Sequence, residues 1–200
     1  MYQLMRSICH FPSRFLLAVG LSLALGTSVH GATFNIEDSV QHMHWQSMSL
    51  VLGDERHFRA VETHSYSDAS LSLNATAGVC DLPWLEMRVE LDERQGKSRA
   101  VNLVPARLRV DEAIRHESMA EFITERGDSG FYTHFYLNDV TSLIEEMREG
   151  DAFYLGFEQG EQAPWYMTFS LQGAEAAIER MQAACHANTN ASIGTGRENR

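Results

Sequence analysis

Histidines are the residues whose type and spacing first suggest chemistry in this chain. The segment QHMHW places His42 and His44 two residues apart, so on an extended strand both side chains would point to the same face. Imidazole nitrogens bind zinc and copper, and His57 or His64 from the next strand-like run would complete a site. Histidines on the solvated face of an acidic protein are the simpler interpretation, because two ligands at this spacing do not fix a third. These four residues are the metal candidates, and we expect no bound metal or cofactor.

The segment GDSG, which contains Ser129, resembles the sequence around the nucleophile of chymotrypsin-like serine proteases. In those proteins the glycines let backbone amides approach a developing oxyanion while a distant histidine activates the serine. Here Phe131 stands where a further glycine is expected, and no histidine follows the two alanines typical of that family. We therefore interpret the segment as a turn that precedes a strand. The sequence predicts no catalytic residue, and we expect that the protein is not an enzyme.

The beginning of the chain has the order of a secretory signal peptide. Residues 1–31 contain two arginines and no acidic residue, an apolar run at 15–25, and then small residues. That run is well short of the roughly 20 apolar residues that a membrane-spanning helix needs. We therefore expect cleavage after Gly31 or Ala32, no integral membrane segment in the mature chain, and a periplasmic or secreted location in a bacterium.

Signal cleavage also determines how the three cysteines are interpreted. Cys9 lies in the signal peptide, so the mature chain keeps Cys80 and Cys185. An exported chain with an even number of cysteines is typically disulfide-bonded. A nucleophilic Cys185 would instead need a base or a helix N-terminus to stabilise its thiolate, and it stands at the other end of its predicted helix. We predict a Cys80–Cys185 disulfide that closes a loop of about 106 residues, worth on the order of 4.7 kcal/mol.

The mature sequence is predicted to form a single domain, residues 32–186, followed by a disordered polar tail at 187–200. Loss of the two signal-peptide arginines changes the formal net charge from −11 to −13. So acidic a surface disfavours binding to nucleic acid and adhesion to anionic lipid. It is compatible with a soluble exported protein.

Alternating apolar residues predict that most of the domain is β-strand. In WLEMRVEL, Leu85 and Met87 alternate with charged residues, which indicates a strand with one buried and one solvated face. Pro105 suggests an edge strand or a bulge, residues 112–126 are compatible with a helix or a pair of strands, and the polar segment DERQGK predicts a hairpin turn. The predicted strands are 45–53, 56–64, 69–76, 84–92, 98–111, 130–137, 151–157 and 164–170.

Two helices are predicted near the C-terminus. The first starts at Asn138 or Asp139, both favoured caps, and ends at Gly150. The second begins near Ser170 and carries an apolar stripe as far as Cys185. Strands precede these helices rather than alternate with them, so the predicted fold is mainly β: an antiparallel β-sandwich with one or two packed α-helices near the C-terminus. The stripe consists of Leu171, Ala174, Ile178, Met181 and Cys185.

The C-terminal order of elements resembles the end of the invasion-associated locus B family and of related exported bacterial domains of unknown function. In that family a helix ending in glycine precedes a β-hairpin, whose second strand passes through a Ser-Leu-x-Gly turn into an alanine-rich helix. The resemblance covers residues 138–185 and implies a periplasmic or surface β-sandwich without known catalytic residues. It implies fold and compartment but no role in invasion and no site. The matching residues are Gly150, Phe157, Phe169, Ser170, Leu171, Gly173 and Ala177.

Three functions are compatible with these features. The first is a non-enzymatic exported protein that binds an envelope or periplasmic protein or a cell-wall component. The second is an inhibitor or immunity protein whose acidic surface faces a basic exported hydrolase. The third is a hydrolase that uses histidine and carboxylate side chains, with His42, His44 or His57 as its base. We favour the first, because no motif in the sequence assembles a catalytic set.

Overall fold

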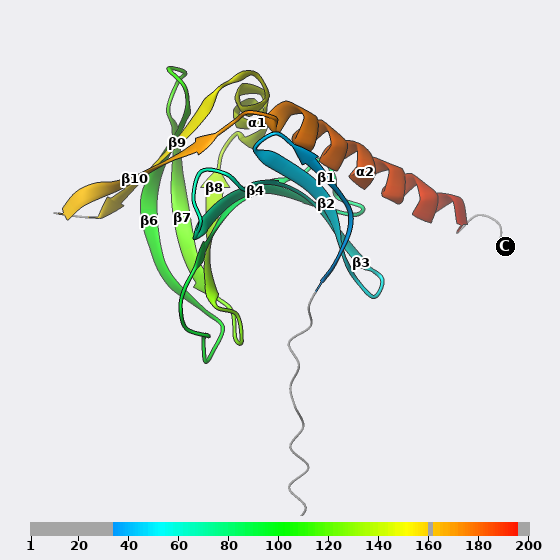
Figure 1. Ribbon diagram of the computed structural model, residues 1–200, viewed down its shortest axis with the longest axis horizontal. Coiled ribbons are helices and arrows are strands. Elements are labelled where there is room, and N and C mark those ends of the chain that lie inside the picture. Colours follow the sequence, from blue (N-terminus) through cyan, green and yellow to red (C-terminus); the bar gives the residue numbers. More distant parts are fainter. Residues whose placement is uncertain (1–33, 160–161, 196–200) are drawn as a thin grey trace, which may run out of the picture. The chain divides into compact units, whose positions relative to one another are not determined.

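The strands form one continuous antiparallel sheet (Figure 1). The structure, a computed structural model, describes residues 34–159 and 162–195, so the expected signal peptide and residues 196–200 of the expected tail lie outside the described residues. Within these ranges ten strands are hydrogen-bonded in the order β1-β2-β3-β4-β5-β8-β7-β6-β9-β10. The strands are β1 (Asn35–His42), β2 (Trp45–Leu52), β3 (Glu55–Glu62), β4 (Ala69–Thr76), β5 (Trp84–Glu90), β6 (Arg99–Val110), β7 (His116–Thr124), β8 (Gly130–Leu137), β9 (Ala152–Gln159) and β10 (Gln162–Ser170).

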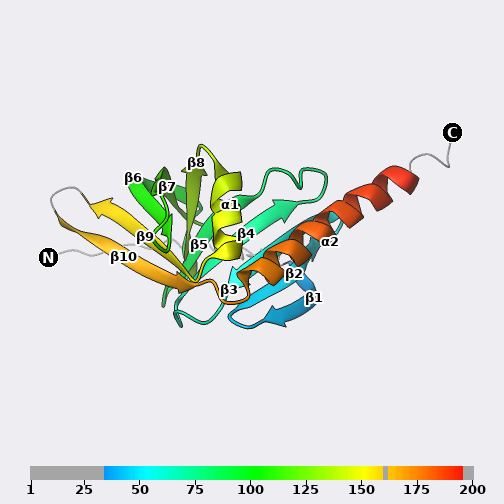
Figure 2. The same ribbon diagram turned by 90° about the horizontal axis from the view of Figure 1, so that it is seen from above.

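The mainly antiparallel β class and both C-terminal helices are confirmed. Helix α1 (Val140–Glu149) is capped by Asp139, whose side chain accepts a backbone hydrogen bond from the first turn, and it stops at Gly150. Helix α2 (Ala174–Thr195) begins later than predicted, because a turn through Gly173 separates it from β10. All ten strands belong to a single sheet, so the helices, rather than a second hydrogen-bonded sheet, form the layer that covers it (Figure 2).

The apolar face of the sheet packs against the two helices. Helix α2 lies on β2, β3 and β4, while α1 lies against α2 and the end of β6. The predicted stripe of α2 is buried, from Ala174 to Cys185. No helix in the described part of the chain combines the length and apolarity that crossing a membrane requires. The largest fully buried side chains are Trp45, Phe153, Phe157, Phe169, Leu71, Leu73, Leu85, Met87, Leu108, Leu143, Met147 and Leu155.

The neighbours of β6 differ from the sequence prediction. The segment DERQGK does not form a hairpin, because β5 pairs with β8 while β6 pairs with β7 and β9. The ambiguous residues 112–126 contain a strand, β7, and no helix. The ladder between β6 and β9 begins at Ala106, so Pro105 stands just outside it, where the missing N–H costs no bond to β9.

Helix α2 extends past the position at which the sequence predicts a disordered tail. Of the expected tail at 187–200, the part up to Thr195 is helical, which corrects the prediction. The hydroxyl of Thr189 accepts a hydrogen bond from the backbone N–H of Gly78 and donates one to the carbonyl of Cys185. The bond from Gly78 attaches this extension of α2 to the segment between β4 and β5. Polar composition alone does not reveal such a contact.

Candidate functional site

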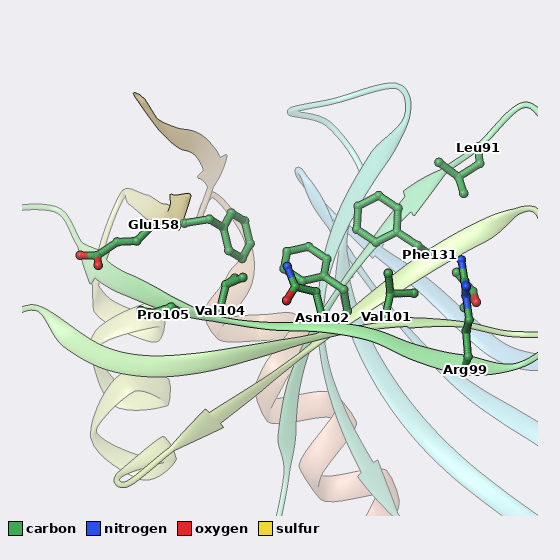
Figure 3. A pocket seen from close by; sticks show the side chains of 11 residues that line it. Leu91, Arg99, Val101, Asn102, Val104, Pro105, Phe131 and Glu158 are labelled. Atoms are coloured by element: carbon green, nitrogen blue, oxygen red, sulfur yellow. The ribbon is translucent and has the colours of Figure 1, made fainter. Parts of the chain in front are cut away.

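A cleft of about 730 Å³ opens beside the first half of β6 (Figure 3). Most of its lining is apolar, and Arg99 and Glu158 lie at its two ends. Helix α1 meets β6 at Val110, the opposite end of the strand from Arg99. The cleft is therefore bounded by strands and by the connection after β5. Its lining residues are Leu91, Arg99, Val101, Asn102, Val104, Pro105, Phe122, Thr124, Phe131, Phe157 and Glu158.

A bulge in β6 directs two consecutive side chains into the cleft. Ala100 lies opposite Ile123 of β7, whereas Asn102 lies opposite the next residue, Phe122, so Val101 is the extra residue. In a regular strand consecutive side chains point to opposite faces, and a bulge interrupts that alternation. Val101 and Asn102 can therefore both line the cleft. Val101 remains 52% exposed, so its isopropyl group is available for contact with a ligand.

Phenylalanines from three separate strands form the apolar wall of the cleft. The ring centroid of Phe122 lies 5.6 Å from that of Phe131 and 5.3 Å from that of Phe157. Phe157 in turn stacks on Trp165 of β10, with centroids 5.2 Å apart. Contacts at these separations are attractive and fix the shape of the wall. Because Trp165 touches the wall and is 36% exposed, its fluorescence should respond to occupancy of the cleft.

A polar network centred on Glu86 occupies the face of the sheet opposite the core residues Leu85 and Met87. One carboxylate oxygen accepts a hydrogen bond from Arg59 Nη2 at 3.2 Å, and the other contacts His134 Nε2 at 2.9 Å. The sequence predicts a solvated Glu86, but it is only 6% exposed. The prediction fails because long side chains from β3 and β8 cover the carboxylate and balance its charge.

His134 gives the stability of the fold a pH dependence. The hydrogen bond to Glu86 raises the pKa of His134, burial opposes this effect, and the charges of Glu86, Glu121 and Glu125 add to it. A raised pKa means that the folded state binds the proton more tightly than the unfolded state. This contribution to stability is complete below the ordinary histidine pKa of about 6.5 and is lost as pH rises through the higher folded value.

We therefore expect a His134→Gln variant to show a flatter dependence of unfolding free energy on pH above about 6 than the parent chain. Glutamine keeps a donor for Glu86 but cannot titrate. Urea denaturation at a series of pH values would measure the difference. His186→Gln is the matched control, since the contact of His186 with Asp81 is longer, at 3.6 Å, and exposed. Identical slopes for His134→Gln and the parent chain would contradict the assignment.

The four histidines named as metal candidates do not converge on one point. His42 and His44 do not lie on the same strand, because the chain turns at Met43, which has a positive φ. His44 and His64 do meet, but their rings are stacked, with centroids 3.7 Å and planes 10° apart. Stacked imidazoles direct their nitrogen lone pairs within parallel planes rather than at a shared ion. His57 lies between a threonine of β4 and a glutamate of β3. In residues 34–159 and 162–195 no group of three His, Cys, Asp or Glu side chains is arranged so that it could hold a metal ion.

A serine–histidine contact joins two turns. Nδ1 of His44 lies 2.7 Å from Oγ of Ser170, a distance that would suit activation of a nucleophile. However, Ser170 Oγ also accepts a hydrogen bond from the N–H of Gln172, and the other neighbour of His44 is the ring of His64, not a carboxylate. Trp45 Nε1 donates to the carbonyl of Ser170 at 2.7 Å. We interpret the contact as a clasp between the β1–β2 turn and the start of α2.

The GDSG segment is the turn between β7 and β8, and its central residue is Asp128 rather than Ser129. The Asp128 carboxylate accepts hydrogen bonds from the N–H of Gly130, the hydroxyl of Tyr132 and Nη2 of Arg88. Burial alone would raise the pKa of Asp128, but these three bonds outweigh it and hold the pKa below its ordinary value. The segment therefore orders a turn, as the sequence suggests, and fixes the position of β8 at one wall of the cleft.

Cys80 and Cys185 are joined by a disulfide, the same pair that the sequence analysis predicts. Their Cα atoms lie 5.8 Å apart. Cys185 belongs to the buried stripe of α2, and Cys80 to the connection between β4 and β5. The bond therefore attaches the middle of α2 to the sheet and is far in sequence from the residues of the cleft.

The sequence analysis names Pro105, Phe131 and Phe157 for other reasons, but it does not predict that they line a cleft. One signal for the cleft is present in the segment RAVNLVPA, where Val101, Leu103 and Val104 do not follow simple alternation. That irregularity corresponds to the bulge. The approach of Phe131 and Phe157 to β6 depends on strand order, which no local pattern specifies.

Neither a protein-family model nor a curated protein sequence matches this chain. Among solved structures, the fold is similar to the crystal structure of invasion associated protein B from Bartonella henselae, with a TM-score of 0.52 and 14% sequence identity. The match covers 74% of this chain and 97% of that chain. At this identity the likeness concerns the fold alone, and it extends well beyond the C-terminal segment that suggested the resemblance.

Proposed function

We propose that this chain is an exported, non-enzymatic binding protein that holds a component of the bacterial cell envelope in the cleft beside β6. The observation that carries the proposal is the cleft itself, with a volume of about 730 Å³ and a mainly apolar lining with few polar groups. These are the usual features of ligand sites, which have volumes of about 300–1,000 Å³. The polar groups at the cleft include no nucleophile held by a base.

The compartment is inferred from the leader segment and from the disulfide. The apolar leader followed by small residues is typical of export, and a Cys80–Cys185 disulfide is stable in an oxidising compartment such as the periplasm. The similarity in fold to invasion associated protein B supports grouping the chain with that family of exported β proteins. The acidic composition favours a ligand other than nucleic acid.

A substitution at the rim of the cleft tests this proposal. Val101→Asp places a charge at an exposed cleft residue, and Ile114→Asp makes the same change at a residue that is 83% exposed and does not line the cleft. Each mature protein is incubated with envelope extract, recovered, and measured by native mass spectrometry. We expect a one-to-one complex of defined mass for the parent chain and for Ile114→Asp. The amount of this complex should be at least about tenfold lower for Val101→Asp, because burying a charge in an apolar site costs free energy.

Two outcomes would contradict the proposal. Equal complex formation by Val101→Asp and the parent chain would place binding outside the cleft, as an inhibitor that uses its acidic surface would do. Chemical conversion of the bound component during incubation would show an enzyme, and the bound component is therefore recovered and its mass compared with that of the unbound material.

A further inference from the structure

The end of the cleft at Arg99 carries a cation that forms no ion pair among the described residues, although the protein as a whole is acidic. The connection before β6 runs against the β7–β8 turn, because Gln95 donates its N–H to the carbonyl of Asp128 and accepts a bond from the N–H of Gly127. A further contact, from the N–H of Arg126 to Ser98 Oγ, continues the same alignment. Four basic residues of these two adjoining segments have no ion-pair or hydrogen-bond partner for their side chains among the described residues: Arg94, Lys97, Arg99 and Arg126.

Three acidic groups near this end are engaged, whereas Asp92 and Glu93 of the same connection are exposed and have no side-chain partner among the described residues. Asp128 is held by Arg88 and Tyr132, and Glu90 is paired with Arg88 at 2.7 Å. Glu125 accepts a hydrogen bond from Ser98. Among the lining residues of the cleft, Arg99 is therefore the cation that faces no partner in the described part of the chain.

The charged residue at the opposite end of the cleft is Glu158, which is ion-paired. Glu158 forms an ion pair with Arg107, which also lies 3.4 Å from Glu117. Between Glu158 and Arg99 the wall is formed by phenylalanine rings and by Val101. The cleft thus combines an apolar wall with a cation at one end, which is complementary to a molecule with an apolar chain and an anionic head.

On this basis, we propose that the occupant of the cleft is a single-chain anionic amphiphile, with an aliphatic chain along Phe122, Phe131 and Phe157 and a carboxylate or phosphate head beside Arg99. The assignment rests on the proposed function, since it names the chemistry of the component bound there. A single molecule is favoured over a membrane surface, because the net charge of −11 repels an anionic bilayer while the cation at the cleft acts over a short distance.

Binding of pure compounds to the mature protein tests the assignment. Dodecyl phosphate, dodecanoate and dodecyltrimethylammonium share a chain but differ in head group, and each is titrated below its critical micelle concentration. Trp165 fluorescence and isothermal calorimetry report binding. We expect both anions to bind at least about tenfold more tightly than the cation, and each added methylene that is buried to raise affinity up to about fourfold.

Substitutions then locate the head and the chain. Arg99→Gln should weaken the two anions about three- to tenfold, since a partly exposed charged hydrogen bond is lost, and should not weaken the cation. Arg99→Lys should keep most of the anion preference. Arg115→Gln is the control, because Arg115 is exposed, unpartnered among the described residues and outside the cleft. Val101→Asp should weaken every chain-bearing compound. All of these positions are exposed, and circular dichroism verifies that each variant is folded.

Each of the following results would overturn the amphiphile assignment. Inorganic phosphate bound as tightly as dodecyl phosphate would show an anion site without a chain site. Equal affinity for anionic and cationic chains, or an Arg99→Gln variant that behaves like Arg115→Gln, would remove the head-group contact. If the cleft-dependent envelope complex contains a polypeptide, the ligand is a protein rather than an amphiphile, and the proposed binding function still holds. If neither an envelope component nor a pure amphiphile binds at the cleft, both proposals fail.

Discussion

A double variant in which Cys80 and Cys185 are both replaced by alanine is expected to be less stable by about 2–5 kcal/mol than the parent chain. The disulfide joins residues 105 positions apart in sequence, so breaking it greatly enlarges the conformational freedom of the unfolded chain. For a loop of this size the chain-entropy relation gives about 4.7 kcal/mol. Both cysteines are buried, at 6% and 0% exposure, and alanine leaves no unpaired polar group in their place.

Denaturant unfolding with and without a reductant measures this effect. The parent chain should lose stability on reduction, and the double alanine variant should not respond to the reductant. The parent chain, purified from the compartment to which it is exported, should contain no free thiol in a mass-based alkylation assay. Two free thiols, or equal unfolding midpoints for the oxidised and reduced parent chain, would contradict a structural role for the bond.

Local periodicity was sufficient to predict most strands but not their order. The alternation around Leu85 and Met87 depends only on which side of a strand is buried, so β5 is visible in the sequence. The partner of β5 depends on contacts between distant segments, and the hairpin predicted from DERQGK is wrong. Leu91 instead donates its N–H to the carbonyl of Ser129, which places β8 beside β5. Strand β1 was not predicted, because its side chains are almost all exposed and give no apolar alternation.

The candidate site was less predictable than the fold for the same reason. The histidines attracted attention because of their chemistry, yet the turn at Met43 and the stacking of His44 on His64 are tertiary features. The cleft depends on a one-residue bulge at Val101 and on phenylalanines contributed by three strands. Glu86 shows the converse case, in which a residue on the predicted solvated face is buried because neighbouring strands supply Arg59 and His134.

Gly173 belongs to the C-terminal motif on which the family resemblance depends, and the structure supplies the physical reason for a glycine at this position. Its φ is +90°, which L-residues with a side chain rarely adopt. A Cβ atom built on Gly173 would also overlap the backbone carbonyl of His42 in the β1–β2 turn. The N–H of His44 donates to the carbonyl of Gln172 at 3.0 Å, so the two turns are already in direct contact. The absence of a side chain therefore permits the start of α2 to meet the sheet.

Gly173→Ala is accordingly expected to cost about 3 kcal/mol or more of unfolding free energy, from the unfavourable φ together with displacement of the backbone at His42. Gly53→Ala is the matched control, because Gly53 also has a positive φ, +60°, but a Cβ there would meet nothing within 4 Å. The control should lose only about 1–2 kcal/mol, the cost of the left-handed conformation alone. Thermal and urea unfolding of the two variants would measure the difference. A Gly173→Ala variant that fails to fold, while Gly53→Ala folds, would also support the larger cost at Gly173. Equal losses in the two variants would show that the contact between the β1–β2 turn and the start of α2 can relax, and that the glycine is required only for its backbone conformation.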